Sequence, residues 1–364
     1  MRLFGNKLCD MSFQLTWPTL LAKLLTKSDL TRAEAAWAME QIMSGEAAEA
    51  QIGAFMIALR SKGESVDELS GLVDTMLTHA VLLETGSDAV DIVGTGGDLV
   101  GTVNISSMSS ILTAAAGIPV LKHGSRSASG KTGSSEMLEV LGVRLDLSPD
   151  RVAEIFKEVG ITFFFAPVFH PAMRHVAPIR KQLGVPTTFN FLGPLANPAQ
   201  PIATALGVSH LEIAPLMAAE LAARGRTALV LRGNDGLDEL TTTDNSTIWQ
   251  VVGGEVSEHQ LDARDFGLAR VDQSKLLGGD AQANARVAKD VFDGDVSGNL
   301  SAVRDIVLLN AASGIVAYEL AKDATRADVE LNVRFEDAIS RSRAALDSGA
   351  AAAKLEQWVA ITQQ

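Results

Sequence analysis

Cysteine is almost absent from this chain of 364 residues, which contains Cys9 and no other. A lone cysteine excludes an intramolecular disulfide and a cysteine-based zinc site. Proteins without disulfides are typical of a reducing compartment, so we expect a cytoplasmic location.

Aromatic residues are also scarce, at 5% of the chain, although hydrophobic residues together make up 47%. The apolar residues are mainly Ala, Leu and Val, which favours helices packed on a buried sheet over an all-β sandwich. The length predicts one large domain, or a large domain with a small one.

Basic residues are in deficit, because 31 Lys and Arg stand against 44 Asp and Glu, for a net charge of −13. Proteins that bind nucleic acids non-specifically usually present a basic face, so this balance argues against a nucleic-acid partner. An acidic protein that binds an anionic small molecule must concentrate its cations in one place or use a metal ion.

Apolar runs of membrane-spanning length are not evident, and we expect no membrane partner. The stretch Ile111–Val120 is apolar but short, and Gly117 and Pro119 interrupt it. The first residues lack the apolar core of a signal peptide, and residues 1–13 are expected to form a loose tail.

Residues 14 to about 85 carry signals for helices only. Thr31 with Glu34, and Ser65 with Glu68, form capping boxes that mark two helix starts. Apolar residues follow each start at helical spacing. These signals predict a small all-helical domain.

The pattern changes at Asp91, where a short β-rich run is followed by a glycine cluster, an apolar helix and a second strand. Such a βαβ unit builds a parallel sheet. Five prolines predict a loop-rich segment with short helices over 171–200. Further strands are predicted at 163–165, 228–231 and 247–252, a loop over 255–275, and helices over 283–322 and 333–361. The expected fold class is α/β, with a small all-helical domain and a larger α/β domain whose mainly parallel central sheet is flanked by helices.

The segment Gly94-Thr95-Gly96-Gly97-Asp98 lies between a predicted strand and the next helix. Glycines there let backbone N–H groups approach an anion, and the helix N-terminus adds its dipole. A dinucleotide-binding fingerprint is a competing interpretation, but Leu99 occupies its third glycine position. A tight turn without a ligand would not need three glycines in four positions, so we interpret this segment as an anion-binding loop.

Short polar residues open the next helix, in the order Asn104-Ile105-Ser106-Ser107. Such residues at a helix start usually act as N-caps. Because they follow the glycine loop directly, their hydroxyls are expected to point at the same anion.

The stretch Lys122-His-Gly-Ser-Arg-Ser-Ala-Ser-Gly-Lys-Thr132 follows a predicted strand and gathers three cations and a histidine. A Walker A loop is an alternative, but five residues rather than four separate Gly124 from Gly130, and 133–136 is expected to separate the loop from the next helix. A basic Gly/Ser-rich loop that faces another glycine loop indicates a phosphate or pyrophosphate site. His123 alone fits a structural role as well as a ligand contact.

Two charged groups complete the candidate site. Asp238 and Glu239 follow a predicted strand, and open α/β sheets bind ligands at the carboxyl ends of their strands. Adjacent acids in a loop are usually only solvated, but beside a polyphosphate they are suited to Mg²⁺. The proline-rich segment carries a basic group, which is either a solvated face or a binding site for a carboxylate: Arg174, His175, Arg180 and Lys181.

Together these motifs resemble the anthranilate phosphoribosyltransferase family, as do the segments Gly184–Pro198 and Gly278–Asn284. The likeness runs from about residue 14 to 360. It implies a nucleoside-phosphorylase-type transferase fold, with a helical domain over 14–85 and 173–200 and an α/β domain over 86–172 and 201–364. It further implies a homodimer formed through the helical domain, phosphoribosyl pyrophosphate and anthranilate as substrates, and a place in tryptophan biosynthesis.

The resemblance also assigns site residues. Ser106, Asp238 and Glu239 would hold two Mg²⁺ ions per subunit. Anthranilate would contact Gly94, His123, Gly124, Ser125 and Arg180, with Arg180 on its carboxylate. Phosphoribosyl pyrophosphate would contact a larger set: Gly94, Thr95, Gly96, Gly97, Asp98, Thr102, Asn104, Ser106, Ser107, Lys122, Arg126 and Ser129. No covalent nucleophile is expected.

Two positions depart from the family pattern. Ser125 stands where the family usually has Asn beside the aromatic substrate, and Gly130 stands where it usually has Ser near the phosphate loop. Both bear on affinity more than on the type of reaction.

Two rival functions stay open on the same scaffold. A nucleoside phosphorylase would use inorganic phosphate and need no metal pair, and the acids at 238 and 239 count against it. A nucleic-acid-binding paralogue is disfavoured by the net charge of −13.

Overall fold

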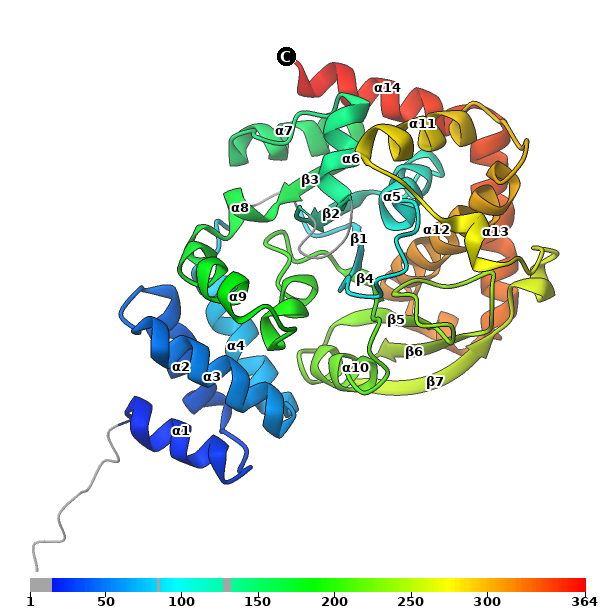
Figure 1. The fold of residues 1–364 in the computed structure, drawn as a ribbon. Helices are drawn as coiled ribbons and strands as arrows, with labels where there is room; N and C mark the ends of the chain where they lie inside the picture. Colours follow the sequence, from blue (N-terminus) through cyan, green and yellow to red (C-terminus); the bar gives the residue numbers. More distant parts are fainter. Residues whose placement is uncertain (1–14, 84–85, 127–131) are drawn as a thin grey trace, which may run out of the picture.

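Helices alone form the N-terminal part of the chain in the computed structural model, which describes residues 15–83, 86–126 and 132–364. They are α1 (Trp17–Leu25), α2 (Arg32–Met43), α3 (Glu49–Lys62) and α4 (Val66–Thr78), which lie together at one end of the molecule (Figure 1). Both predicted capping boxes are confirmed, because Thr31 and Ser65 accept from the N–H groups of Glu34 and Glu68, whose carboxylates accept in return.

A single sheet forms the centre of the larger part, with the strand order β3-β2-β1-β4-β5-β6-β7. Its strands are β1 (Val90–Gly94), β2 (Val120–Gly124), β3 (Ile161–Phe165), β4 (Ala203–Gly207), β5 (Thr227–Gly233), β6 (Ser246–Val252) and β7 (Glu255–Leu261). The strands from β3 to β5 are parallel, and β6 and β7 are antiparallel additions at one edge. The expected α/β class with a mainly parallel sheet is confirmed.

The prediction of a loop over 255–275 is wrong for residues 255–261, because these form β7, which pairs along its whole length with β6. Most of its side chains are exposed, so the strand lacks the apolar alternation by which strands are predicted. The sequence pair Gly253-Gly254 was a usable signal for a hairpin, because a tight turn between paired strands requires positive φ. Both glycines have positive φ in the structure.

The expectation that 133–136 separates the basic loop from the next helix is also wrong. Helix α6 (Ser134–Leu141) begins there, and the Glu136 carboxylate accepts from the N–H of Gly133 at 2.5 Å. This arrangement is an N-terminal cap rather than a linker.

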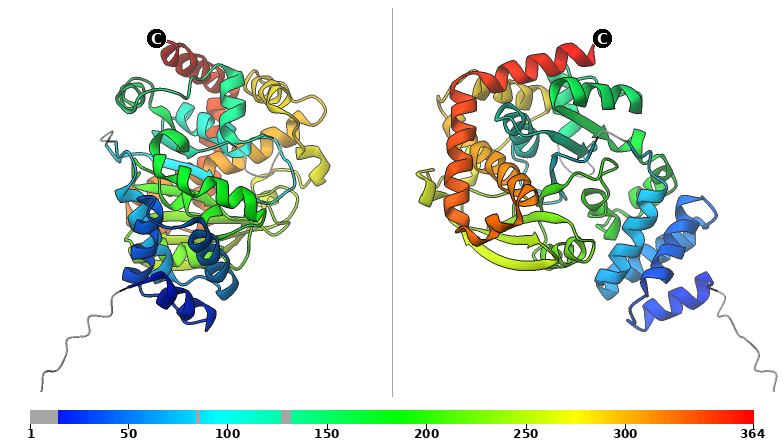
Figure 2. Two further views of the ribbon diagram at one scale, coloured as in Figure 1. Left: turned by 60° about the vertical axis from the view of Figure 1, so that its left-hand side comes forward. Right: turned by 180° about the vertical axis from the view of Figure 1, so that it is seen from behind.

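Helices cover both faces of the sheet (Figures 1 and 2). On one face, α5 (Ile105–Ala115) and α12 (Leu300–Lys322) pack on the parallel strands, and on the other α10 (Ala214–Ala223) packs on β5 and β6. The remaining helices are α7 (Pro149–Val159), α8 (Ala166–Phe169), α9 (Ala177–Leu183), α11 (Ala281–Phe292), α13 (Leu331–Asp347) and α14 (Ala350–Thr362).

Helix α12 corrects the expectation that no apolar run has membrane-spanning length. It is the one helix in the described residues that is long and apolar enough to cross a membrane. However, 78% of its most apolar window is buried within the fold, where Ser109 and Thr113 of α5 donate hydrogen bonds to its backbone carbonyls. The apolar character of α12 therefore matches its position as a core helix.

The proline-rich segment packs against the N-terminal helices. Val176, Ile179 and Phe189 share an apolar cluster with Phe55 of α3, and the Thr188 hydroxyl donates to the Glu64 carboxylate at 2.5 Å. Short helical turns and α9 therefore connect the helical part to the edge of the sheet where the candidate site lies.

A buried acid lies where α10 meets α4. The Glu220 side chain is fully buried, with Arg224 Nη1 3.5 Å from its Oε1, while Arg224 also pairs with Asp74 of α4 at 2.7 Å. Burial raises the pKa of Glu220 to about 7, and the charge of Asp74 adds to this effect while Arg224 opposes it. The folded protein therefore binds the Glu220 proton more tightly than the unfolded chain does.

Ionisation of Glu220 should destabilise the fold progressively as the pH rises from about 4.5 to about 7. Glu220→Gln removes this charge, so it should raise the free energy of unfolding at pH 8 by about 1–3 kcal/mol and change it little near pH 4.5. Urea unfolding at the two pH values measures the difference, with the exposed Glu212→Gln as control. Equal stabilisation at both pH values would contradict this prediction.

Candidate functional site

A cavity of about 1000 Å³ opens at the carboxyl ends of the parallel strands. Its wall is built from the loops after β1 to β5, together with the start of α5, the proline-rich segment and residues 277–279. This is the edge at which open α/β sheets bind ligands. Segments that lie far apart in the sequence therefore supply a single site.

The glycine loop after β1 lies in this wall, with left-handed backbone at Gly96 and Gly97. Gly94 is required for a different reason, since a Cβ there would lie 2.2 Å from Asp238 Oδ2. At Gly207, which ends β4, a Cβ would lie 1.5 Å from the Asp238 backbone oxygen. The absence of these two side chains lets the loop after β5 approach both strands.

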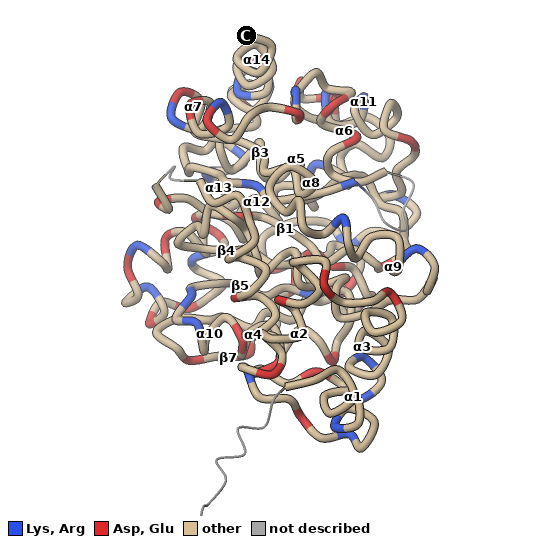
Figure 3. Tube along the Cα trace, turned by 90° about the vertical axis from the view of Figure 1, so that its left-hand side faces the viewer, with Lys and Arg blue, Asp and Glu red and all other residues tan. Residues whose placement is uncertain are grey.

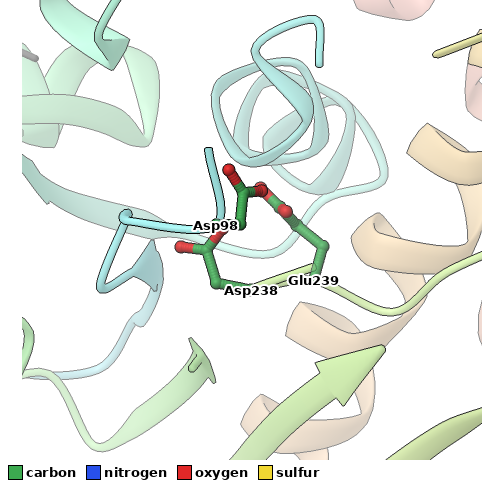
Figure 4. Close-up of side chains that lie close together, drawn as sticks. All are labelled: Asp98, Asp238 and Glu239. Atoms are coloured by element: carbon green, nitrogen blue, oxygen red, sulfur yellow. The ribbon is translucent and has the colours of Figure 1, made fainter. Parts of the chain in front are cut away.

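Three carboxylates meet at this approach, from Asp98 in the glycine loop and from Asp238 and Glu239 (Figure 4). One oxygen of each lies within 4.8 Å of the others. Burial, followed by the charge of Asp238, raises the pKa of Asp98 to about 6, and burial and both neighbouring acids raise the pKa of Glu239 well above its usual value. Glu239 Oε2 is buried without a hydrogen-bond partner among the described residues.

Such crowded oxygen ligands suit a divalent cation, which would relieve their repulsion and complete the bonding of Glu239. The predicted metal residues Asp238 and Glu239 are thus brought together. Asp98 was assigned only to the phosphoribosyl pyrophosphate, and its place in this cluster was missed. The signal was available, since an acid directly after a glycine loop comes close to any ligand of that loop.

Hydrogen bonds fix the position of the acid cluster. Asp238 Oδ2 accepts from the N–H of Gly96 at 2.7 Å. Asn310 of α12 pairs with the backbone N–H and carbonyl of Leu240, at 2.9 and 2.8 Å. The residue that follows Glu239 is therefore held by a core helix.

Lys122 is the buried cation of the site, with 1% of its surface exposed. Its Nζ donates to the Ile92 carbonyl at 2.6 Å and lies 3.4 Å from Ser106 Oγ. Burial lowers the pKa of Lys122 to about 8, although the nearby acids, Asp91 first, oppose this shift. Lys122 therefore stays largely protonated at neutral pH and balances part of the negative charge of the cluster.

The start of α5 contributes Asn104 and Ser106 to the cavity wall. Asn104 does not cap its helix, because its amide donates to the Gly133 carbonyl and its Oδ1 accepts from Asn284 of α11 at 2.8 Å. This bracing role of Asn284 was missed, although its segment was noted for its likeness to the family. Ser107 is fully buried and does not line the cavity.

His123 and His170 lie side by side in the wall, with ring centroids 5.2 Å apart. His123 Nδ1 bonds to the Gly193 carbonyl at 3.1 Å, and His170 Nε2 bonds to the Ala196 carbonyl at 2.9 Å. Burial lowers the pKa of His123 to about 3 and that of His170 to about 4. Both rings are therefore neutral at neutral pH, and His170 was missed from the sequence.

Arg180 of α9 lines the cavity, and its guanidinium has no hydrogen bond or ion pair to the described residues. Burial lowers its pKa, because the charge is partly removed from water. Arg174 also lines the cavity, whereas His175 and Lys181 do not. An unpaired, partly buried guanidinium is suited to an anionic ligand.

The other predicted contact residues that the structure describes also line this cavity: Thr95, Thr102, Gly124, Ser125 and Arg126. Arg126 is already engaged, since its guanidinium pairs with Glu139 at 2.9 Å and lies over the Phe165 ring. Ser129 and the family departure at Gly130 lie outside the described residues.

The cavity has chemically distinct parts. Acids, backbone N–H groups and a buried lysine gather around the glycine loop. An arginine that pairs with none of the described residues and two neutral imidazoles come from the proline-rich side and the end of β2. Such a site can hold a metal-bound polyphosphate beside a second, carboxylated ligand. Elsewhere on the chain, basic and acidic positions are interspersed (Figure 3).

Two family models match the chain and divide it near the start of the sheet. Residues 18–80 match the helical bundle domain of a glycosyl transferase family, and residues 86–352 match the a/b domain of the same family.

Similar proteins include several anthranilate phosphoribosyltransferases. An anthranilate phosphoribosyltransferase of Leifsonia xyli is 52% identical over 353 residues, covering 97% of this chain and all of the relative, and one of an Arthrobacter species is 51% identical over 348 residues, covering 96% of both. The crystal structure of the Thermus thermophilus enzyme has a TM-score of 0.85 at 36% identity, covering 95% of this chain and 99% of the other. The Saccharomyces cerevisiae enzyme in complex with PRPP and Mg has a TM-score of 0.84 at 27% identity, covering 95% and 98%.

Proposed function

The chain belongs to the anthranilate phosphoribosyltransferase family, and on that premise we propose how its cavity carries out the reaction. The 5-phosphoribosyl group passes from phosphoribosyl pyrophosphate to the amine of anthranilate, giving N-(5-phosphoribosyl)anthranilate and pyrophosphate in tryptophan biosynthesis. The observation that carries the assignment of substrates to residues is that one cavity holds both the acid cluster and the unpaired Arg180.

The pyrophosphate end is assigned to the glycine loop and the start of α5. The backbone N–H groups of Gly97 and Asp98, the helix N-terminus and protonated Lys122 would bind the phosphate oxygens, with contacts from Thr102 and Asn104. The reaction uses Mg²⁺, and we infer two ions per subunit, held by Ser106, Asp238 and Glu239, with Asp98 as a further ligand. When bound, the ions compensate the charge that develops on the leaving pyrophosphate.

The amine end is assigned to the opposite part of the wall. The Arg180 guanidinium would hold the anthranilate carboxylate, and Gly94, His123, Gly124 and Ser125 would line the ring. As the bond to pyrophosphate breaks, the anomeric carbon gains oxocarbenium character, and the neutral amine attacks it and then releases one proton to water. Positioning the two substrates in line supplies the remaining catalysis, so no covalent nucleophile is needed.

The assembly we propose is a cytoplasmic homodimer formed through the helical domain. Leu25 of α1 is 76% exposed, and Ile57 of the neighbouring α3 is 40% exposed. Apolar residues exposed on adjacent helices are suited to a second copy of the same surface.

Activity should require Mg²⁺, and Asp238→Asn or Glu239→Gln should lower it at least tenfold. Each substitution removes a charge that a cation needs in order to stay beside the pyrophosphate. Loss of anthranilate fluorescence measures turnover with increasing Mg²⁺ and with excess chelator. Full turnover in excess chelator would contradict the metal-binding role assigned to Asp238 and Glu239.

Arg180→Ala should raise the Michaelis constant for anthranilate about ten- to a hundredfold, since a charge-assisted Arg–carboxylate contact contributes roughly 1.5–3 kcal/mol. The constant for phosphoribosyl pyrophosphate should stay within a few-fold of the original. Arg180→Lys should recover part of the loss, because an ammonium cannot reproduce the planar fork. If the phosphoribosyl pyrophosphate constant rises instead, Arg180 belongs to the phosphate end.

Light scattering at micromolar protein should give about twice the 38.4 kDa of one chain. Leu25→Asp should shift the mass towards that of a single chain, because it places a charge in the proposed interface. The exposed Val296→Asp, in the α11–α12 connection, serves as a control. A single-chain mass for the unmodified protein would overturn the dimer.

A further inference from the structure

Asp91 and Asn197 form a buried hydrogen-bond hub that contacts the backbone of His123. Asp91 of β1 is completely buried and accepts from the His123 backbone N–H at 3.1 Å and from the Asn197 amide at 2.8 Å. The same amide nitrogen donates to the Leu121 carbonyl at 2.8 Å. Asp91 and Asn197 thus join β1, the end of β2 and the proline-rich segment at one point.

The segment held by Asn197 also supplies the carbonyls that bind the two imidazoles. Gly193 accepts from His123 Nδ1 and Ala196 accepts from His170 Nε2. A carbonyl oxygen carries no proton, so the ring nitrogen bonded to it must be the N–H. His123 is therefore the Nδ1–H tautomer and His170 the Nε2–H tautomer.

The other nitrogen of each ring then carries a lone pair. His123 Nε2 and His170 Nδ1 are both buried and have no hydrogen-bond partner among the described residues. Both residues belong to the cavity wall. Buried acceptors without a donor are unfavourable, so an N–H donor brought by a ligand would stabilise this part of the wall.

We propose that Asp91 and Asn197 are positioning residues that hold His123 and His170 as a pair of unprotonated acceptors for the N–H groups of the aromatic amine. This inference rests on the proposed function and adds a selection rule to it. Phosphates and carboxylates are acceptors and gain nothing from this pair, whereas the amine of anthranilate is a donor. With its carboxylate on Arg180, the substrate is bound by two groups of opposite hydrogen-bonding character.

The tautomers can be tested without any ligand, by ¹⁵N NMR of the histidine rings in the full chain. His123 should give the Nδ1–H pattern and His170 the Nε2–H pattern, with signals identified by His123→Gln and His170→Gln. In Asp91→Asn and Asn197→Ala, these single-tautomer patterns should become mixtures. Nε2–H at His123 in the unmodified protein would overturn the proposal.

Selection is tested by calorimetric binding of anthranilate and benzoate, which lacks the amine, in the presence of Mg²⁺ and pyrophosphate. The unmodified protein should prefer anthranilate at least tenfold. Asp91→Asn and Asn197→Ala should reduce the preference to within about threefold while benzoate affinity changes less than threefold, because Arg180 still holds the carboxylate.

A matched control is Thr113→Val, which deletes a buried hydrogen bond to the Ala311 carbonyl on the opposite face of the sheet. It should lower stability and leave the preference unchanged. Two soluble hub variants that keep the tenfold preference would overturn the positioning role. Absence of turnover with anthranilate would overturn the proposed function instead, and the ligand-free tautomers would still be decided by NMR.

Discussion

The approach of the loop after β5 to the ends of β1 and β4 is the constraint on which the site depends. The backbone of Asp238 fills the space that a methyl group at position 207 would take, and its side chain fills the space beside position 94. Two glycines therefore let three acids meet where their charges repel. This arrangement is unfavourable in isolation, and the surrounding fold stabilises it through the Gly96 amide, Asn310 and the buried Lys122.

Charge is distributed in the cavity according to the chemistry of the two ligands. Repulsion between carboxylates prepares one end for a cation and the polyphosphate that accompanies it. At the other end Arg180 is partly buried and has no counter-ion among the described residues, so a ligand carboxylate would complete its bonding. One end of the cavity favours a cation and the other favours an anion. This difference disfavours binding of either substrate in the place of the other.

Local signals in the sequence predicted much of this structure. The capping boxes, the first βαβ unit, the glycine loop and the paired acids all depend on neighbours within a few residues. The contacts that were missed depend on tertiary pairing. Asp98 joins the acid cluster from 140 residues away in the chain, and His170 meets His123 only because β3 lies beside β2. Ser106 and Ser107 differ because successive helical residues point about 100° apart, so only one of them faces the cavity.

The placement of α12 has a consequence for how the chain folds during synthesis. The helix covers β1, β4 and β5 and accepts hydrogen bonds from α5, yet it spans residues 300–322. A ribosome delivers the N-terminal helices and every strand before this cover exists. One apolar face of the sheet thus remains exposed to water until the last fifth of the chain has begun to emerge from the ribosome. The helical part has its own short-range contacts and can form early. The edge of the sheet that carries the site cannot be completed until α12 is available. In that interval the nascent chain is most prone to aggregation.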